Sequence, residues 1–316
     1  MQIGMIGLGR MGGNMVARLL AAGHECHVFD LDRTAIHEAE RYGAKGAASI
    51  DDLVRALEAP RVAWIMIPAA RVDAVLGDLV ARLGQGDIVV DGGNSHYEDA
   101  IRRAAALGEH GVRFLDVGVS GGVWGRELGY CQMIGGERES VDRLEPVFAA
   151  LATGEKASSA HLHCGPSGAG HFVKMVHNGI EYGLMQAYAE GFNMLEQAGQ
   201  LLRREAGEPE DTNGVLDVAA IAEVWRHGSV IRSWLLDLAA RALAEDPKLT
   251  AFTGAVADSG EGRWALETAI EQRVPVPVLA AALFARFDSR GGGEFAHQIL
   301  SALRHLFGGH HEPPQR

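Results

Sequence analysis

Residues 1–12, MQIGMIGLGRMG, determine the fold that we expect for the first half of the chain. A short apolar run leads directly into Gly7, Gly9 and Gly12, and residues 15–22 continue with apolar side chains at helical spacing. This order predicts a buried strand, a glycine turn and a helix. The first glycine permits the tight turn, the second lets the backbone approach a pyrophosphate, and the third lets the helix pack closely on the strand. The pattern favours a dinucleotide-binding turn over the alternative, a plain glycine-rich turn.

A second strand is expected at residues 25–29, and it is followed directly by Asp30. A carboxylate at this position can accept hydrogen bonds from the ribose hydroxyls of an adenosine and repel a 2′-phosphate. We therefore expect NAD as the cofactor, while the nearby Arg33 keeps NADP as the alternative. Asp32 precedes an expected helix at residues 34–42 and is interpreted as its N-cap.

Strand and helix patterns continue to alternate as far as residue 151. Strands are expected at 61–67, 87–91, 113–117 and 130–134, and helices at 51–58, 72–83, 97–110 and 140–151. This alternation predicts an α/β domain of the Rossmann type, with a doubly wound parallel sheet. Ligands bind beyond the carboxyl ends of strands in such sheets. The loops 91–95 (DGGNS) and 116–122 (DVGVSGG) lie there and are candidate ligand loops, although each could be an ordinary turn or helix cap.

The second half of the chain has the pattern of an all-α domain. The HLHC segment, residues 161–164, is interpreted as a last short strand and not as a metal site, because alternate side chains on a strand diverge from one ion. Helices are expected at 169–202, 215–227, 231–244, 264–272, 278–287 and 294–307, and the acidic stretch 203–213 is expected to be an exposed connection. We therefore place a domain boundary near Cys164, with residues 1–164 as a dinucleotide-binding domain and 165–316 as a helical domain.

The helix that opens the second half carries a polar stripe. Lys174, His177, Asn178 and Glu181 recur at i, i+3, i+4 and i+7 and so share one face. A lysine shielded from water can accept a proton near neutral pH, and a glutamate on the same face can act as a second proton carrier. The alternative is a surface helix whose charges are merely solvated. Apolar residues on the other faces are expected to pack against protein: Val173, Met175, Val176, Ile180 and Leu184.

Composition excludes several classes of protein. The chain has 316 residues, enough for two domains, and its net charge of −12 argues against a general nucleic-acid binder. Three scattered cysteines do not suggest a disulfide framework. The N-terminus does not resemble a signal peptide, and the longest apolar run, residues 274–285, is short and contains two prolines. We expect a cytoplasmic protein without a membrane span or a nucleic-acid partner.

Four motifs carry a resemblance to a known family. They are GLGRMG (7–12), DGGNS (91–95), VSGG (119–122) and KMVHNGIEYG (174–183). The sequence resembles the decarboxylating 6-phosphogluconate dehydrogenases, of the short, NAD-preferring kind, from Gly7 almost to the C-terminus. The last motif is the most specific, because related 3-hydroxyacid dehydrogenases are not expected to combine this histidine and glutamate with the lysine and asparagine. Residues 263–286 (RWALETAIEQRVPVPVLAAALFAR) and 304–310 (RHLFGGH) support the resemblance.

The resemblance implies a reaction and catalytic roles. The family oxidises 6-phospho-D-gluconate to D-ribulose 5-phosphate and CO2 with reduction of the nicotinamide cofactor, without a metal ion. The residue matching Lys174 accepts the proton of the C3 hydroxyl and then stabilises the enolate oxygen during loss of CO2. The residue matching Glu181 protonates C1 of the resulting enediol.

The resemblance also implies that residues 165–316 form the substrate-binding and dimerisation domain, and it implies binding residues that fall into three groups. The sugar acid is held by the matches to Asn94, Ser120, Gly121, Gly122, His177 and Asn178. Its phosphate is held by the matches to Tyr182, Arg286, Arg304 and His310. The dinucleotide is held by the matches to Gly7, Leu8, Gly9, Arg10, Met11, Gly12, Asp30, Arg33 and Asn94.

The chain departs from the long members of the family in three places. Val123 and Trp124 follow the glycine pair where long members tend to be acidic, and Ser259 and Glu261 replace a lysine and a threonine that tend to contact the phosphate. The chain also lacks their second helical repeat. We therefore expect a homodimer, or a dimer of dimers, in which a partner completes the helical domain and Arg304 and His310 could reach the neighbour's site.

Two other functions are weighed against this one. A 3-hydroxyacid dehydrogenase of the 3-hydroxyisobutyrate type would oxidise without decarboxylation, but a small substrate has no phosphate for the arginines. A catalytically silent dinucleotide-binding sensor would need the glycine turn but not the polar stripe.

Overall fold

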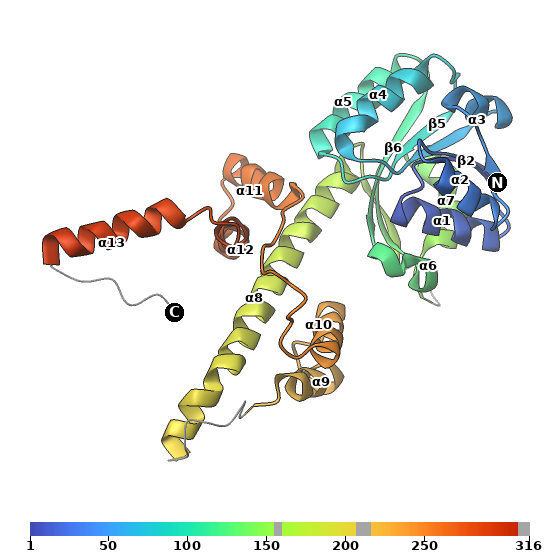
Figure 1. Cartoon of the computed structure of the whole chain (residues 1–316). Coiled ribbons are helices and arrows are strands. Elements are labelled where there is room, and N and C mark those ends of the chain that lie inside the picture. Colours follow the sequence, from blue (N-terminus) through green and yellow to red (C-terminus); the bar gives the residue numbers. More distant parts are fainter. Residues whose placement is uncertain (155–159, 207–215, 309–316) are drawn as a thin grey trace. The chain divides into compact units, whose positions relative to one another are not determined.

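The computed structural model describes residues 1–154, 160–206 and 216–308 (Figure 1). The contacts divide the chain into two compact units, Met1–His177 and Asn178–Arg316. The predicted boundary near Cys164 stays a prediction, because the first turns of the long helix that follows it are assigned to the first unit.

An eight-stranded sheet forms the first unit, in the order β3-β2-β1-β4-β5-β6-β7-β8. Its strands are β1 (Gln2–Ile6), β2 (Glu25–Phe29), β3 (Lys45–Gly46), β4 (Val62–Ile65), β5 (Ile88–Asp91), β6 (Arg113–Ser120), β7 (Cys131–Gly136) and β8 (His161–Gly165). The order reverses direction between β1 and β4, where such sheets bind ligands. The predicted Rossmann-type arrangement is confirmed.

One part of the sheet prediction was wrong, because the sheet is not wholly parallel. Strand β7 pairs with β6 in antiparallel register, Ser120 opposite Cys131, and β8 is parallel to β7. The chain leaves β6 through Gly121 and Gly122, both with positive φ, and returns after the short helices η1 (Gly122–Trp124) and α6 (Gly125–Leu128). A connection this short reaches a neighbouring strand only by reversing direction, since a parallel neighbour needs a longer crossover.

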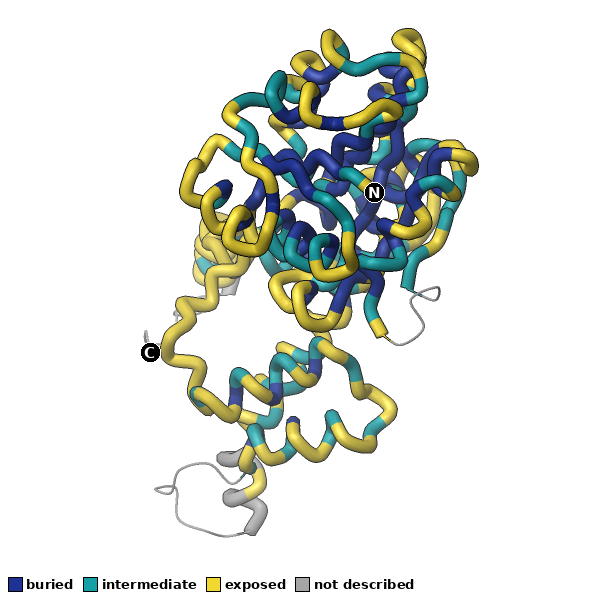
Figure 2. Tube along the Cα trace, turned by 90° about the vertical axis from the view of Figure 1, so that its right-hand side faces the viewer, coloured by how far each residue is buried: buried dark blue, intermediate teal, exposed yellow. Residues whose placement is uncertain are grey.

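Helices cover both faces of the sheet (Figure 1). The buried side chains of one face pack with α1 (Arg10–Ala21), α2 (Arg33–Glu40) and α7 (Arg138–Leu151). Those of the other face pack with α3 (Ile50–Ala56), α4 (Ala69–Val80) and α5 (Tyr97–Gly108). Figure 2 shows that most of the buried residues lie in this unit. The short elements β3, η1 and α6 were not predicted, because two to four residues carry no periodic pattern.

The second unit is helical, which confirms the predicted all-α half. It contains most of α8 (Ala169–Ala206), followed by α9 (Val218–Gly228), α10 (Trp234–Glu245), α11 (Glu261–Gln272), α12 (Pro277–Asp288) and α13 (Glu294–Gly308). The stretch 203–213 was expected to be a connection, but its first four residues extend α8, and the remainder lies outside the described residues.

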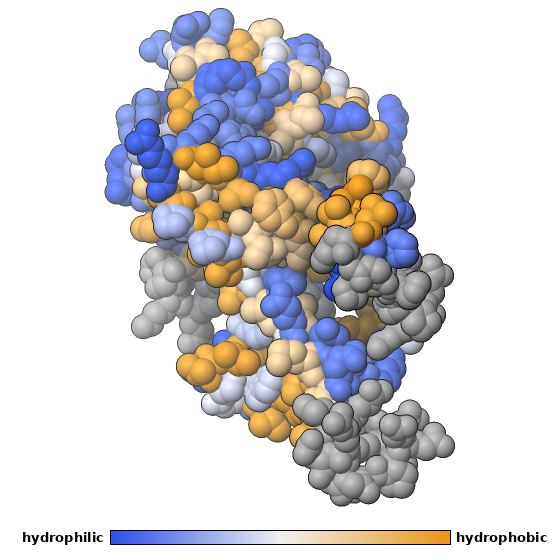
Figure 3. Space-filling view, turned by 90° about the vertical axis from the view of Figure 1, so that its left-hand side faces the viewer, coloured by the Kyte–Doolittle hydropathy of each residue, from blue (hydrophilic) through white to orange (hydrophobic). Residues whose placement is uncertain are grey.

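Most of the apolar residues of α8 that were predicted to pack against protein are not covered by this chain. Met175 is buried at 4% exposure, but Val173, Val176, Ile180 and Leu184 are 38–52% exposed. Helix α13 likewise exposes five large apolar side chains, Phe295, Ile299, Leu300, Leu303 and Leu306. Hydrophobic patches are visible on the surface in Figure 3. Periodicity identifies an apolar face, but it does not say whether the same chain covers it.

Candidate functional site

The glycine turn has the geometry of a dinucleotide-binding turn. Gly7 has a φ of 98°, and a Cβ built on it would lie 2.5 Å from the carbonyl oxygen of Met66. A Cβ on Gly12 would lie 2.1 Å from the carbonyl oxygen of Gly7, so that α1 packs directly on the turn. In contrast, apart from Gly9 and its two chain neighbours, no atom of the described residues lies within 4 Å of a Cβ built on Gly9. The open position is the one where a pyrophosphate would approach the N-terminus of α1.

Asp30 is fixed beside this turn by two backbone donors. Its Oδ2 accepts a hydrogen bond from the N–H of Leu8 at 2.6 Å, and its Oδ1 accepts from the N–H of Asp32 at 2.8 Å. Asp32 itself accepts from the N–H of Thr34 at 2.8 Å, which confirms its role as the N-cap of α2. Arg33 is exposed at the start of α2 and lines a smaller cavity of about 310 Å³.

A cavity of about 760 Å³ lies beyond the carboxyl ends of β1, β2 and β4 and is lined by Gly7, Gly9 and Asp30. Its wall is mostly apolar and includes a segment that the sequence analysis assigned no role: Met66, Ile67, Pro68, Ala70, Ala74 and Val75. The signal for that segment was its position directly after β4, at the point where the strand order reverses. The open turn, the fixed acid and the apolar wall fit the adenosine half of a dinucleotide. Arg10, Met11 and Gly12 form the first turn of α1 beside it.

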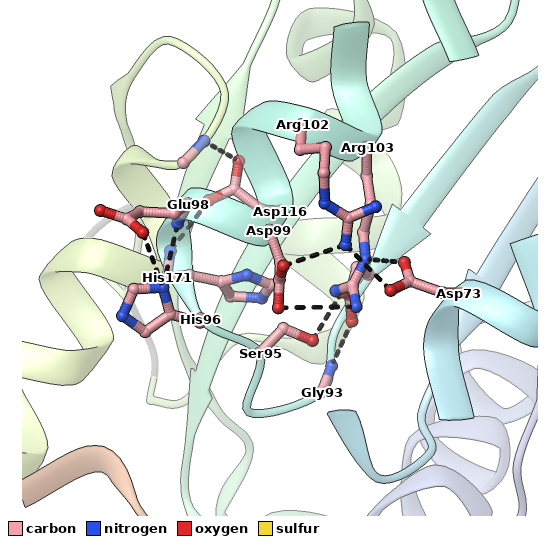
Figure 4. A network of polar contacts seen from close by, with 12 residues as sticks. Asp73, Gly93, Ser95, His96, Glu98, Asp99, Arg102, Arg103, Asp116 and His171 are labelled. Atoms are coloured by element: carbon pink, nitrogen blue, oxygen red, sulfur yellow. Dashed lines mark hydrogen bonds and ion pairs between the residues drawn. The ribbon is translucent and has the colours of Figure 1, made fainter. Parts of the chain in front are cut away.

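The DGGNS loop is held by a buried ionic network that was not predicted from the sequence (Figure 4). Asp91 is fully buried and accepts hydrogen bonds from the N–H of Gly93 (3.1 Å), the hydroxyl of Ser95 (2.7 Å) and Nη1 of Arg103 (3.1 Å). Asn94 is exposed between the two anchored residues. One feature of the sequence indicated this network: Arg103 lies on the apolar face of its amphipathic helix, together with Ala100 and Leu107.

The start of α8 is built directly on β6. Asp116, fully buried on β6, accepts hydrogen bonds from the N–H groups of Gly168 (2.7 Å) and His171 (2.8 Å) and so caps the helix (Figure 4). A Cβ built on Gly118 would lie 2.3 Å from Cβ of Lys174. Close backbone approach therefore sets Lys174 against β6, near its carboxyl end.

Three predicted residues meet at this point. The Oγ of Ser120 lies 3.3 Å from Nε2 of His177, and Nδ1 of His177 lies 3.4 Å from Nζ of Lys174. Lys174 is buried at 7% exposure. Gly121 and Gly122 follow Ser120 in the turn that leaves β6. A buried amine beside an imidazole and a hydroxyl, at the carboxyl end of β6, can exchange protons with an alcohol substrate.

The second unit brings together two of the predicted phosphate residues. The guanidinium carbon of Arg286 lies 3.5 Å from the ring centroid of Tyr182, and Nη1 of Arg286 donates to the carbonyl of Ala257 at 2.8 Å. Tyr182 is buried at 6% exposure, and its hydroxyl has no hydrogen-bond partner among the described residues. On α8, Asn178 is buried and Glu181 is half-buried.

The last residues to place are the loop of Ser259 and Glu261 and the two phosphate candidates near the C-terminus, Arg304 and His310. The hydroxyl of Ser259 donates a hydrogen bond to the carboxylate of Glu261 at 2.5 Å, and Glu261 is buried. The loop therefore has a carboxylate at the position where long members of the family tend to contact the phosphate. Arg304 is exposed on α13, and His310 lies outside the described residues.

The two histidines of the HLHC segment have separate partners. Residues His161–Gly165 form strand β8, as predicted; His161 pairs with Glu145 at 2.9 Å and Nε2 of His163 contacts the carbonyl of Gly136. Within the part of the chain that the structure describes, no three His, Cys, Asp or Glu residues are grouped as metal ligands. Over the same residues, no helix combines the length and apolarity that crossing a bilayer requires.

Comparison with known proteins gives consistent matches along the chain. Residues 2–165 match the NAD binding domain of 6-phosphogluconate dehydrogenase, and residues 170–209 and 202–311 match the C-terminal domain of the same enzyme. The chain is 45% identical over 312 residues to the NAD(+)-dependent, decarboxylating 6-phosphogluconate dehydrogenase of Haloferax volcanii, covering 98% of both chains. It is 40% identical over 310 residues, again 98% of both chains, to the Bacillus subtilis protein YqeC, which is provisionally named as a 6-phosphogluconate dehydrogenase.

A solved structure agrees with these relatives. Plasmodium falciparum 6-phosphogluconate dehydrogenase matches with a TM-score of 0.81 and 26% identity, over 100% of this chain and 67% of that chain. Because the sequence matches extend over nearly the whole chain, we conclude that the protein belongs to the decarboxylating 6-phosphogluconate dehydrogenase family.

Proposed function

We propose that the protein converts 6-phospho-D-gluconate to D-ribulose 5-phosphate and CO2 with reduction of NAD. The observation that carries this proposal is the contact chain from Ser120 through His177 to Lys174 on a capped, buried helix start. The names of the relatives support the substrate and the decarboxylation.

The cavity beside the glycine turn is the proposed site for NAD. Gly9 leaves room for the pyrophosphate, and Asp30 offers its carboxylate to the ribose hydroxyls, which favours NAD over NADP. NAD bound there supplies the acceptor for the hydride that leaves C3 of the substrate. The carboxylate of Asp30 is already oriented by two N–H donors, so it need not reorganise when the ribose arrives.

Lys174 is the proposed general base and then general acid. Its neutral amine accepts the proton of the C3 hydroxyl while C3 is oxidised to a ketone. The resulting ammonium group then donates a hydrogen bond to the ketone oxygen as the C1–C2 bond breaks, CO2 leaves and negative charge develops on that oxygen. His177 contacts Nζ of Lys174 and is itself contacted by Ser120, so the two residues orient the amine and offer further groups to the substrate hydroxyls.

Glu181 is the proposed acid for the last step. It lies seven residues after Lys174 on the same continuous helix, which separates the two by about 10.5 Å along the axis and returns them to one face. Lys174 passes its proton to the enolate oxygen, which gives the enediol. The carboxylic acid of Glu181 then delivers its proton to C1 of the enediol, the carbon that lost CO2, while Lys174 takes back the hydroxyl proton and the ketone of ribulose 5-phosphate forms. Asn94, Gly121, Gly122 and Asn178 are the proposed contacts to the sugar acid.

Tyr182 and Arg286 are the proposed phosphate contacts within the second unit. A guanidinium on an aromatic ring and a hydroxyl without a described partner are groups that a phosphate can accept from. Arg304 and His310 are proposed as further phosphate contacts that could come from a neighbouring subunit.

A homodimer, or a dimer of dimers, is the proposed assembly. The exposed apolar side chains of α8 and α13 are the surfaces that a second copy would cover. Light scattering tests this directly, because a stable monomer with full activity would contradict it.

The experiment that tests the function uses the purified protein with 6-phosphogluconate and either cofactor, and it follows reduced nicotinamide and released CO2 together. Equal amounts of NADH and CO2 are expected. Reduced nicotinamide without CO2, or activity only on 3-hydroxyisobutyrate, would favour the non-decarboxylating alternative. Binding of NAD without turnover of any sugar acid would favour the silent sensor.

A further inference from the structure

Arg103 is a buried arginine that joins two carboxylates from different elements (Figure 4). Its side chain is 2% exposed, its Nη1 lies 3.1 Å from Oδ2 of Asp91, and its Nε lies 2.7 Å from Oδ1 of Asp73. The planar guanidinium holds two acceptors in a fixed relative geometry, which a lysine ammonium cannot do. Arg103 therefore fixes the end of β5 relative to α4.

Through its contact with Asp91, Arg103 is connected to the loop that carries Asn94. The same Oδ2 that contacts Arg103 accepts from the hydroxyl of Ser95, and Oδ1 accepts from the N–H of Gly93. These two bonds anchor the backbone on both sides of Asn94, whose own side chain is exposed. The position of Asn94 is thus determined by the residues that flank it.

Through its contact with Asp73, Arg103 is connected to the wall of the dinucleotide cavity. Asp73 belongs to α4, and its neighbours Ala70, Arg71 and Ala74 line that cavity. The hydrogen bond from Arg103 is the main cause of the lowered pKa of Asp73, so this carboxylate is ionised when it holds the arginine. The network therefore connects the candidate substrate loop to the candidate cofactor wall.

We propose that Arg103 is a positioning residue, which sets the Asn94 loop against the α4 wall without touching substrate or cofactor itself. This inference rests on the proposed function for the role of Asn94. A buried ion pair is weak evidence for net stability, because desolvation offsets much of the attraction. The geometric effect of the network is the placement of Asn94, and a shift of about 1 Å in a substrate-positioning group can cost about a hundredfold in rate.

The test compares Arg103→Lys with a matched neighbour. Arg102 is 56% exposed and pairs on the surface with the same Asp73 (2.9 Å) and with Asp99 (2.9 Å). The substitution Arg102→Gln therefore removes a comparable charge but leaves the contact between Arg103 and Asp91 in place. For Arg103→Lys we expect kcat/KM for 6-phosphogluconate to fall about 10- to 100-fold, with raised KM values for both 6-phosphogluconate and NAD, because the Asn94 loop and the α4 wall lose the same anchor. Arg102→Gln is expected to stay within about twofold on all three measures.

Measuring KM and kcat separately distinguishes a positioning role of Arg103 from a loss of protein stability. A partly unfolded population lowers kcat in proportion to the inactive fraction but leaves KM unchanged. Should Arg103→Lys fail to fold, Ser95→Ala removes one anchor of the same loop at almost constant shape, and its kcat/KM is expected to fall about 3- to 10-fold, since one hydrogen bond is lost. Wild-type kinetics in both Arg103→Lys and Ser95→Ala would overturn the proposal.

Hydrogen exchange of the peptide covering residues 91–97 tests the same inference without any substrate. Faster exchange in Arg103→Lys than in Arg102→Gln and the wild type is expected, because the loop loses its anchor. Identical exchange in all three proteins would overturn the positioning role, even in an active enzyme. A wild type that does not turn over 6-phosphogluconate would instead refute the proposed function, and the exchange result would still decide on Arg103.

Discussion

Gly118 and Lys174 are in such close contact that a single methyl group on the glycine would collide with the lysine. The Cβ of an alanine at position 118 would lie 2.3 Å from Cβ of Lys174 and 3.0 Å from the carbonyl oxygen of Gly170. One side of this contact is strand β6, and the other is the backbone of α8, so neither can simply rotate away. The contact determines how closely the proposed base approaches the carboxyl end of the sheet.

Gly118→Ala is therefore expected to displace Lys174 and reduce turnover. We expect kcat to fall about a hundredfold and the free energy of unfolding to fall by about 1–3 kcal/mol from overpacking, with NAD affinity unchanged. Steady-state kinetics and denaturant unfolding measure both. Gly77→Ala is the matched control, because no described atom lies within 4 Å of a Cβ at that helical position. Normal turnover in Gly118→Ala would show that the contact is not needed for catalysis.

Asp30→Ala is expected to relax the preference for NAD. The substitution removes both the acceptor for the ribose hydroxyls and the negative charge that repels a 2′-phosphate, while Arg33 stays nearby. The ratio of kcat/KM for NAD to that for NADP is expected to fall at least about tenfold, since a charged hydrogen bond is lost. Asp32→Ala serves as the control, because that carboxylate caps α2. An unchanged ratio in Asp30→Ala would assign the preference to other residues.

Asp73 gives a prediction for the pH dependence of stability. Hydrogen bonding to Arg103, followed by Arg102, lowers its pKa in the folded protein. A carboxylate with a lowered folded pKa contributes stability above its unfolded pKa of about 3.9 and loses it as the pH falls through the folded value. The difference in unfolding free energy between the wild type and Asp73→Asn should therefore be present at neutral pH and shrink below about pH 4. A difference that is constant with pH would contradict this assignment.

Glu181→Gln is expected to impair the final proton transfer. The variant should still reduce NAD and release CO2 in a first turnover, because those steps depend on Lys174, while steady-state turnover falls about 100- to 10,000-fold. Rapid-quench measurement of ribulose 5-phosphate against NADH distinguishes the steps. Unchanged steady-state turnover would remove Glu181 from the mechanism.

Local patterns predicted the parts of this molecule that depend on local geometry. The roles of Gly7, Gly9 and Gly12 follow from spacing, because each glycine acts within one turn between a strand and a helix. Lys174 and His177 could be placed on one helical face for the same reason. The alternation of strands and helices predicted the doubly wound sheet without any tertiary information.

Tertiary contacts explain what the sequence could not predict. Ser120 meets His177 across 57 residues, a proximity that depends on the antiparallel return of β7 and on Asp116 capping α8. The partnership of Asp91 with Arg103 likewise depends on which face α5 presents to β5. The sequence could not show which chain covers the exposed face of α8, because an apolar stripe carries no information about its partner.

The proposed reaction depends on Lys174 as the proton-transferring base held by His177, and replacing this lysine examines that role. The rate of turnover of 6-phosphogluconate by Lys174→Met is compared with that of the wild type, with NAD affinity measured in parallel by fluorescence. We predict a loss of about a thousandfold or more in kcat, with NAD binding within about threefold of the wild type. A fall in kcat of less than about tenfold, with the substrate still decarboxylated, would show that Lys174 is not the base.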